Sequence, residues 1–420
     1  MKNFASKFAP ENKIDNKNSF DMKNLLTLLF AVSALSLSAQ PLERKFGADP
    51  LNIPTRREWQ KRVRPVVMEF FQSEVYGKVP PTQPEVSFRI IGEGKAYEGK
   101  VLRREVEMTV GTTKALILIY LPSGHKGKVP AFVGMNFKGN HQTSPDPEIT
   151  ISANAPRGKE LGADPERGAA ESRWPVEMIT EAGYGVVTLY RGDIDPDFDD
   201  GFQNGIHPHF YAEGQTRPYA DEWGTIGAWA WSLSRVMDYL ERDKDIDHKR
   251  VAVIGHSRLG KTSLWAGAQD ERFAIVISND SGCGGAALSM RKHGETVAVI
   301  NKNFPHWFCD NYNKYSNNEE SLWIDQQGLI ALIAPRPVYV ASASLDDWAD
   351  PEGEYLSALH ASPIYELYGK KGLTSSAMPA INTPVGEGHI GYHLREGKHD
   401  INAYDWAQYI RFANRHFFGK

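Results

Sequence analysis

The chain has 420 residues, of which 41% are hydrophobic and 24% are charged, and its formal net charge at pH 7 is −4. A chain of this length and composition buries a large core and is typical of a soluble globular protein. The small net charge gives no sign of a nucleic-acid-binding surface, so we expect no nucleic-acid partner.

The first forty residues differ from the rest and predict export. Residues 1–21 are polar and rich in Lys and Asn, and we interpret them as a non-native or misassigned extension. Met22 then precedes the apolar run LLTLLFAVSALSLSA, which is too short to span a bilayer and ends in small residues. We therefore predict a signal peptide over residues 22–39, a periplasmic or secreted protein, and no stable membrane insertion after cleavage. A retained N-terminal membrane anchor is the alternative.

The chain contains two cysteines, Cys283 and Cys309. Because exported proteins fold under oxidising conditions, we predict a disulfide between them. Two buried free thiols are the alternative.

The region from Glu85 to Leu121 contains the strand-like runs VSFRII, REVEMTV and ALILIYL, separated by turns with glycine. This pattern predicts an antiparallel start to a sheet. Five further short apolar runs follow, namely VPAFVGMNF, GYGVVTLY, RVAVIG, FAIVIS and RPVYVASAS. Helical stretches lie between several of them, above all GTIGAWAWSLSRVMDYLE, so we predict a mainly parallel sheet with helices on both faces. Since there is no internal repeat or linker, residues 45–420 are expected to form one α/β domain.

The stretch VIGHSRLGKT, residues 253–262, places Ser257 between a predicted buried strand and a predicted helix. The nucleophile elbow G-x-S-x-G holds a serine on such a turn, at the carboxyl end of the sheet where open α/β proteins bind ligands. Here the second glycine, Gly260, comes one residue late, so the spacing alone is a weak signal. A serine hydroxyl also needs a histidine as base and a carboxylate that orients the histidine.

His399 is the preferred base, because it lies on a glycine-containing loop before a predicted C-terminal amphipathic helix, where α/β hydrolases carry their histidine. His389 and His393 are the alternatives. Two acids compete for the third position: Asp280 follows the strand FAIVIS, and Asp346 follows the strand VYVASAS. We prefer Asp346, which follows the later strand, and keep both.

Arg258 and Lys261 lie one helical turn apart beside the predicted nucleophile. Cations at a helix N-terminus favour a substrate that is anionic or becomes so as an oxyanion forms, and solvated surface charges are the alternative. The expected oxyanion donors are the backbone N–H of Arg258 and a group near Met135 to Phe137. The acidic run Asp193 to Gly201 superficially suggests calcium ligands. It lacks the glycine and the closing glutamate of an EF-hand, so we expect no metal.

Several segments together resemble a known family. GHSRLGK, SGCGGAAL, HWFCDNY, APRPVYVASAS, WADPEGE and GYHLREGKHDINAYDW are similar to the bacterial glucuronoyl esterases of carbohydrate esterase family 15. The resemblance covers most of residues 50–420 and explains the late glycine, because the elbow of the family resembles G-x-S-R-x-G-K. It implies an α/β-hydrolase fold of three layers and a serine esterase without metal or cofactor. The implied substrate is an ester of 4-O-methyl-glucuronic acid on glucuronoxylan, formed with a lignin alcohol.

The resemblance also implies roles for individual residues. Ser257 matches the nucleophile of the family and His399 matches its base. Arg258 matches an arginine that helps to stabilise the oxyanion. Lys261 matches a lysine that holds sugar hydroxyls, and Trp348 matches an aromatic wall of the uronate site.

The acid and the exact substrate stay open at this point. Members of the family differ in whether the acid stands at the Asp280 or the Asp346 position, and this chain has aspartate at both. An acetyl xylan esterase or a broad carbohydrate carboxylesterase uses the same triad and is the alternative function. A carbohydrate-binding protein without catalysis would lack the triad. We expect a monomer.

Overall fold

The computed structural model describes residues 51–53, 55–155 and 166–420. The predicted extension (1–21), the predicted signal peptide (22–39) and the predicted domain start at residue 45 lie outside the described residues. From Leu51 to Lys420 the chain forms one compact unit. Within the described residues, no helix is both long enough and apolar enough to cross a bilayer.

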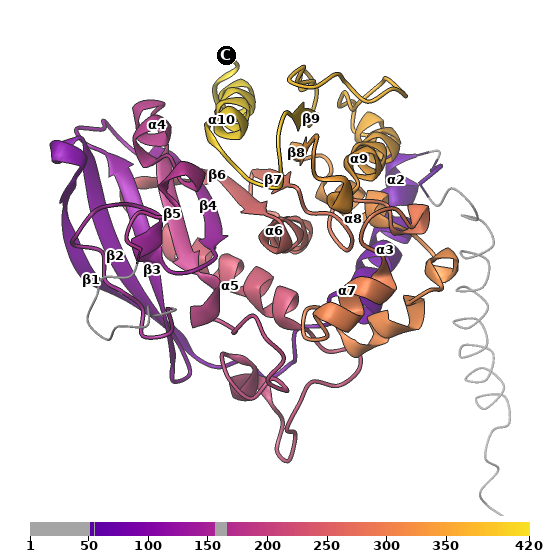
Figure 1. Cartoon of the computed structure of the whole chain (residues 1–420), viewed down its shortest axis with the longest axis horizontal. Coiled ribbons are helices and arrows are strands. Elements are labelled where there is room, and N and C mark those ends of the chain that lie inside the picture. The colour runs from indigo at the N-terminus through magenta and orange to yellow at the C-terminus, as the bar shows by residue number, and fades with distance from the viewer. Residues whose placement is uncertain (1–50, 54, 156–165) are drawn as a thin grey trace, which may run out of the picture. The chain divides into compact units, whose positions relative to one another are not determined.

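The centre of this unit is a nine-stranded sheet, counted over the described ranges, with the strand order β1-β2-β3-β5-β4-β6-β7-β8-β9 (Figure 1). The strands are β1 (Val86–Ala96), β2 (Val101–Val110), β3 (Thr113–Pro122), β4 (Val129–Asn136), β5 (Gly185–Tyr190), β6 (Ile246–His256), β7 (Ile275–Asn279), β8 (Val338–Ala343) and β9 (Ile390–Arg395). The pairs β1/β2, β2/β3 and β3/β5 are antiparallel, and the pairs from β5/β4 to β8/β9 are parallel. The predicted mainly parallel sheet with an antiparallel start is confirmed.

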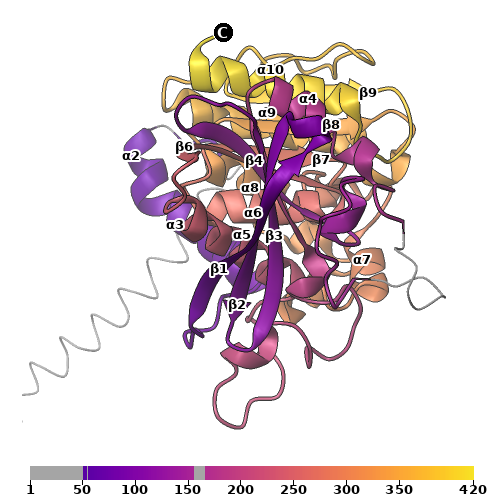
Figure 2. The same cartoon turned by 90° about the vertical axis from the view of Figure 1, so that its left-hand side faces the viewer.

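The two parts of the sheet differ in burial, as their sequences differ in pattern. Strand β1, at the edge that faces the viewer in Figure 2, carries exposed and half-buried residues along most of its length, because a sheet edge meets water. Every residue of β4, β5, β7 and β8 is buried. Strands covered on both faces require such continuous apolar runs.

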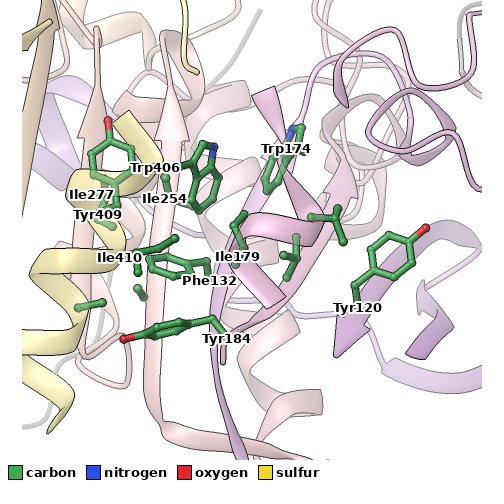
Figure 3. Packing of buried hydrophobic residues seen from close by; sticks show 14 of the residues in the cluster. Tyr120, Phe132, Trp174, Ile179, Tyr184, Ile254, Ile277, Trp406, Tyr409 and Ile410 are labelled. Carbon is green, nitrogen blue, oxygen red and sulfur yellow. The ribbon is translucent and has the colours of Figure 1, made fainter. Parts of the chain in front are cut away.

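Helices cover both faces of the sheet (Figure 1). They are α2 (Arg56–Glu58), α3 (Arg64–Phe70), α4 (Val176–Glu181), α5 (Thr225–Leu240), α6 (Arg258–Gln269), α7 (Val297–Asn303), α8 (Gln326–Ile333), α9 (Pro351–Glu366) and α10 (Ala403–Phe418). Helices α4 and α10 share a core cluster with one face, in which the Trp406 ring meets the Phe132 ring edge to face at 5.3 Å (Figure 3). Helix α6 packs against β6 and β7 and against α5.

The start of α10 explains why His399 lies on a loop. Asn402 caps the helix: its side chain accepts a hydrogen bond from the N–H of Tyr404, and the Asp405 carboxylate accepts one from the N–H of Asn402. Such a capping box fixes where a helix begins. The loop between β9 and α10 therefore ends at Asn402.

Strand β9 is an element that the sequence pattern does not predict. All six residues of IGYHLR are buried and pair with β8. Glycine and histidine interrupt the β-branched pattern by which the other strands stand out. Its last residue, Arg395, leads directly into the loop that carries His399.

Candidate active site

Ser257 stands at the turn between β6 and α6, with φ 58° and ψ −129°. A positive φ is rare for a residue with a side chain, and this strained backbone is how an elbow presents its hydroxyl. The N–H of Ser257 donates to the carbonyl of Asn279 at 2.8 Å, and its own carbonyl accepts from the N–H of Gly260 at 2.8 Å. The turn is thus held on both sides.

Two glycines let the elbow close. A Cβ atom on Gly255 would lie 1.8 Å from the carbonyl oxygen of Leu259, and one on Gly260 would lie 2.9 Å from Cβ of Ser281. Gly255 lets the helix turn back over the strand, whereas Gly260 lets α6 approach the loop after β7. The late glycine therefore has its own packing reason.

His399 and Asp346 form a hydrogen-bonded pair. Nδ1 of His399 lies 2.5 Å from Oδ2 of Asp346, whose side chain is 6% exposed while that of His399 is 42% exposed. Since an ionised carboxylate only accepts hydrogen bonds, a neutral His399 in this pair carries its proton on Nδ1, which leaves the lone pair on Nε2. A general base needs this tautomer.

Asp280 lies beside this pair without bonding to it. One carboxylate oxygen of each aspartate and one ring nitrogen of His399 lie within 4.8 Å of one another. Among the described residues, neither oxygen of Asp280 has a hydrogen-bond partner. Nη2 of Arg395 lies 3.8 Å from Oδ2 of Asp280. Burial raises the pKa of Asp280 well above its usual value, and the charges of Glu354 and Asp346 raise it further.

Arg395 holds the loop that carries His399. Its buried guanidinium donates hydrogen bonds to the backbone carbonyls of Glu396, Lys398 and Asp400, each at 2.9 Å. Its Nε lies 3.0 Å from the Asp405 carboxylate at the start of α10. The loop therefore folds around one planar cation, whose fork of donors suits several acceptors at once.

His256 packs against the base. The ring centroids of His256 and His399 are 4.5 Å apart, and Nδ1 of His256 lies 2.6 Å from Oδ1 of Asn279. Burial lowers the pKa of His256 well below its usual value, and the nearby charge of His399 lowers it further. His256 is thus a neutral ring that packs against the base. The sequence did not predict this role, because His256 stands there only as part of a strand end.

Arg258 is directed by aromatic rings and a carboxylate. Its Nη1 donates to Oδ2 of Asp197. Its guanidinium carbon lies 4.6 Å from the centroid of the Trp307 ring and 5.3 Å from that of Phe304. The side chain is 26% exposed and is held by these contacts, so it is not a freely solvated charge.

Lys261 is buried, with 4% of its surface exposed, so the alternative of a solvated charge is wrong for this residue. Its Nζ donates to the carbonyl of Ser281 at 2.5 Å and lies 5.6 Å from the centroid of the Trp307 ring. Burial lowers the pKa of Lys261, and the negative charge of Glu295 opposes this effect. An ammonium has three donors, and Ser281 takes one of them.

Trp348 is 55% exposed at the same end of the sheet. Its backbone carbonyl accepts a hydrogen bond from the N–H of Glu295 at 3.0 Å. Burial raises the pKa of the Glu295 carboxyl, while the charges of Lys261 and Arg258 lower it. Glu295 escaped prediction because it lies in the polar stretch RKHGET, where no strand end marks a site.

The alternative histidines lie outside the site. His393 is fully buried in β9, with Nε2 2.8 Å from Oδ1 of Asp405. The His389 ring packs against His416, with centroids 4.9 Å apart. Both positions are structural.

The acidic run Asp193 to Gly201 does not converge on one point. Its three alternate aspartates reach separate partners: Asp193 bonds Asn154, Asp195 bonds His207, and Asp197 bonds Trp307. In the part of the chain that the structure describes, the run supplies no group of three ligand atoms within reach of one ion.

Cys283 and Cys309 are both free and buried, so the predicted disulfide is wrong and the alternative of two free thiols holds. They have separate surroundings. Sγ of Cys309 lies 3.7 Å from the carbonyl of Ser73, while the backbone of Cys283 forms an isolated β-bridge with Ala287. Burial raises the pKa of both thiols, that of Cys309 to about 12.

Known proteins share this sequence and geometry. The family model described as "Glucuronyl esterase, fungi" matches residues 177–369. The carbohydrate esterase MZ0003 of an unknown prokaryotic organism is 48% identical over 382 residues, which cover 88% of each chain. A glucuronoyl esterase from Solibacter usitatus has a similar structure, with a TM-score of 0.82 and 44% identity over 86% of this chain and 94% of that chain. A promiscuous CE15 esterase from the marine bacterial metagenome has a TM-score of 0.80 and 48% sequence identity, over 86% of this chain and 93% of that chain. The chain therefore belongs to carbohydrate esterase family 15, the glucuronoyl esterase family, and is an esterase with an α/β-hydrolase fold.

Proposed function

We propose that this chain is a glucuronoyl esterase that hydrolyses esters of 4-O-methyl-glucuronic acid on glucuronoxylan. Ser257 attacks the ester carbon while Nε2 of His399 takes its proton. Asp346 keeps the imidazole in the required tautomer and stabilises the cation that forms. His399 then passes the proton to the leaving alcohol, and water releases the uronate from the acyl-enzyme by the same steps in reverse order.

The oxyanion of the tetrahedral intermediate needs donors that are already in place. We assign this role to Arg258, through its backbone N–H at the start of α6 and its guanidinium. The region of Met135 to Phe137 after β4 supplies the second donor in this proposal. Arg258 strengthens its contact as charge develops, so it acts mainly on kcat.

The observation that carries the substrate assignment is the buried ammonium of Lys261 near the elbow. Burying a cation is costly unless polar groups meet it, and its two remaining donors suit sugar hydroxyls. Trp348 offers an exposed aromatic face, on which a sugar ring packs. In a uronate ester the sugar lies on the acyl side of the bond, next to the nucleophile. In an acetylated sugar it lies on the alcohol side.

The test compares initial rates on benzyl glucuronate and on acetylated xylose, with wild type and four variants. Ser257→Ala and His399→Ala should each lower turnover by about 10⁴-fold or more without unfolding the protein. His389→Ala is the matched control and should retain near-normal turnover. Lys261→Ala should mainly raise KM for the uronate ester. Faster cleavage of acetylated xylose than of benzyl glucuronate would refute the assignment.

A broader carboxylesterase or acetyl xylan esterase is the second candidate. It is kept because one structural neighbour is described as promiscuous. We also propose that the protein is exported by the leader at residues 22–39. Intact mass of the exported protein tests this, with a new N-terminus near Ala39 or Gln40 as the expected result.

A further inference from the structure

Asp197, within the acidic run, accepts three hydrogen bonds on its carboxylate and forms an ion pair with Arg191. Oδ1 accepts from Nε1 of Trp307 at 2.7 Å and from Nε2 of His306 at 3.1 Å. Oδ2 meets Nη1 of Arg191 at 2.9 Å and Nη1 of Arg258. The side chain of Asp197 is 5% exposed, so water does not compete for these contacts.

The charges around Asp197 keep it ionised. Burial raises its pKa, but the hydrogen bond from His306 and the charges of Arg191 and Arg258 outweigh burial and hold the pKa well below the usual value. Removing one partner from such a buried set leaves the others uncompensated. Asp197 therefore stays a charged acceptor around neutral pH.

Arg258 is fixed by this carboxylate on one side and by aromatic rings on the other. The Trp307 and Phe304 rings stack with centroids 3.7 Å apart and an interplanar angle of 3°, and the guanidinium lies against both. With Nη1 bound to Asp197, Nη2 of Arg258 has no acceptor among the described residues. Nε also has no partner among the described residues, but it is buried, so Nη2 is the guanidinium nitrogen that we expect to reach a substrate.

We propose that Asp197 is a positioning residue for Arg258, which it holds so that Nη2 meets the negative charge that develops on the ester oxygen. This inference rests on the proposed function, in which Arg258 stabilises the oxyanion. Asp197 itself does not touch the substrate. Its carboxylate is already occupied by three hydrogen bonds and by the ion pair with Arg191, so this part of the acidic run has a structural role.

Asp197→Asn tests the proposal, because the amide keeps the shape of the side chain but removes its charge and one acceptor. We expect kcat to fall by about 10- to 100-fold with KM changed less than about twofold, a smaller loss than the 10²- to 10³-fold typical of deleting an oxyanion donor. Asp199→Asn is the matched control in the same loop. Asp199 is exposed and should retain wild-type rates.

A double-mutant cycle with Arg258→Ala separates positioning from general damage. If Asp197 acts through Arg258, Asp197→Asn should lower kcat by less than about twofold in the Arg258→Ala background. Multiplication of the two losses, or a change confined to KM, would overturn the proposal. If Asp197→Asn does not fold, Trp307→Phe removes one N–H donor to Asp197 and keeps an aromatic ring. Its effect on kcat should likewise vanish in Arg258→Ala, and persistence there would count against the proposal.

Both cycles are measured with p-nitrophenyl acetate as well as benzyl glucuronate. Every ester forms an oxyanion, so the coupling between Asp197 and Arg258 should appear with either substrate. A wild-type enzyme that ignores benzyl glucuronate but shows the coupling on the simple ester would refute the proposed function alone. Activity on benzyl glucuronate without coupling would refute the positioning role alone.

Discussion

The loops after β7 and β8 present the same residue type at the same edge of the sheet, with different results. Asp346, after β8, lies 2.5 Å from Nδ1 of His399. Asp280, after β7, is held at φ 45° and is buried, and neither of its oxygens is bonded by a described residue. Closeness to the imidazole is therefore not enough to orient it. The carboxylate must also lie in line with the ring N–H.

The same difference appears in the charges. Asp280 faces the carboxylates of Glu354, Asp346 and Asp405, with Arg395 as the opposing cation, and its pKa is raised mainly by burial. A carboxyl with a raised pKa holds its proton to higher pH and is a poor partner for an imidazolium. We therefore assign the orienting role to Asp346.

The largest effect is expected for Asp346→Asn. An amide at this position favours the wrong tautomer of His399, which in serine proteases costs about 10⁴-fold in kcat. We expect a loss of about 10³- to 10⁴-fold in kcat/KM for benzyl glucuronate at pH 7, measured by initial rates. A loss of less than tenfold would remove Asp346 from the triad.

A much smaller effect is expected for Asp280→Asn. Asp280 makes no hydrogen bond to His399, and an amide keeps the shape of its side chain, so kcat/KM at pH 7 should change by less than about tenfold. The double variant should be less than about tenfold slower than Asp346→Asn. If Asp280→Asn alone loses about 10³-fold, the two aspartates exchange roles.

The smallest effect concerns stability and the residue that joins the two loops. Glu354 accepts from the N–H groups of Ser281 and Gly282 after β7 and from the hydroxyl of Ser342 in β8. Burial raises its pKa from 4.5 to about 7. Between these values the folded protein holds a proton that the unfolded chain has released, so stability falls as the pH rises through this window.

Glu354→Gln should remove this contribution, on the order of 1–3 kcal/mol. Urea unfolding at pH 4.5 and pH 7.5 measures it, and the fall in unfolding free energy should be smaller in the variant than in wild type. The pKa of Asp280 is also raised in the folded protein, so Asp280→Asn is the matched comparison. An unchanged difference in both variants would show that other groups govern the pH dependence.

Much of the fold was predictable, because buried parallel strands appear in the sequence as short apolar runs and amphipathic helices as apolar residues at helical spacing. The sequence also placed Ser257, Asp346 and His399 on loops at one edge, since loop position follows from strand order. What it did not predict depends on contacts between distant segments. Asp197 meets Trp307 across 110 positions, and Lys261 is buried by residues far from the elbow. β9 lacks the pattern of the other strands, and the cysteines were paired on compartment alone, which says nothing about their separation.

The guanidinium of Arg395 holds its loop through main-chain carbonyls, which every residue possesses. The side chains of Glu396 and Lys398 are exposed and take no part in this grip. Substitutions at these positions should therefore change the surface beside His399 without moving His399 itself. A library at positions 396 and 398 would vary the charge and bulk of the surface beside His399, which passes the proton to the departing alcohol in the proposed mechanism, so we expect this loop to be a useful place to alter leaving-group preference.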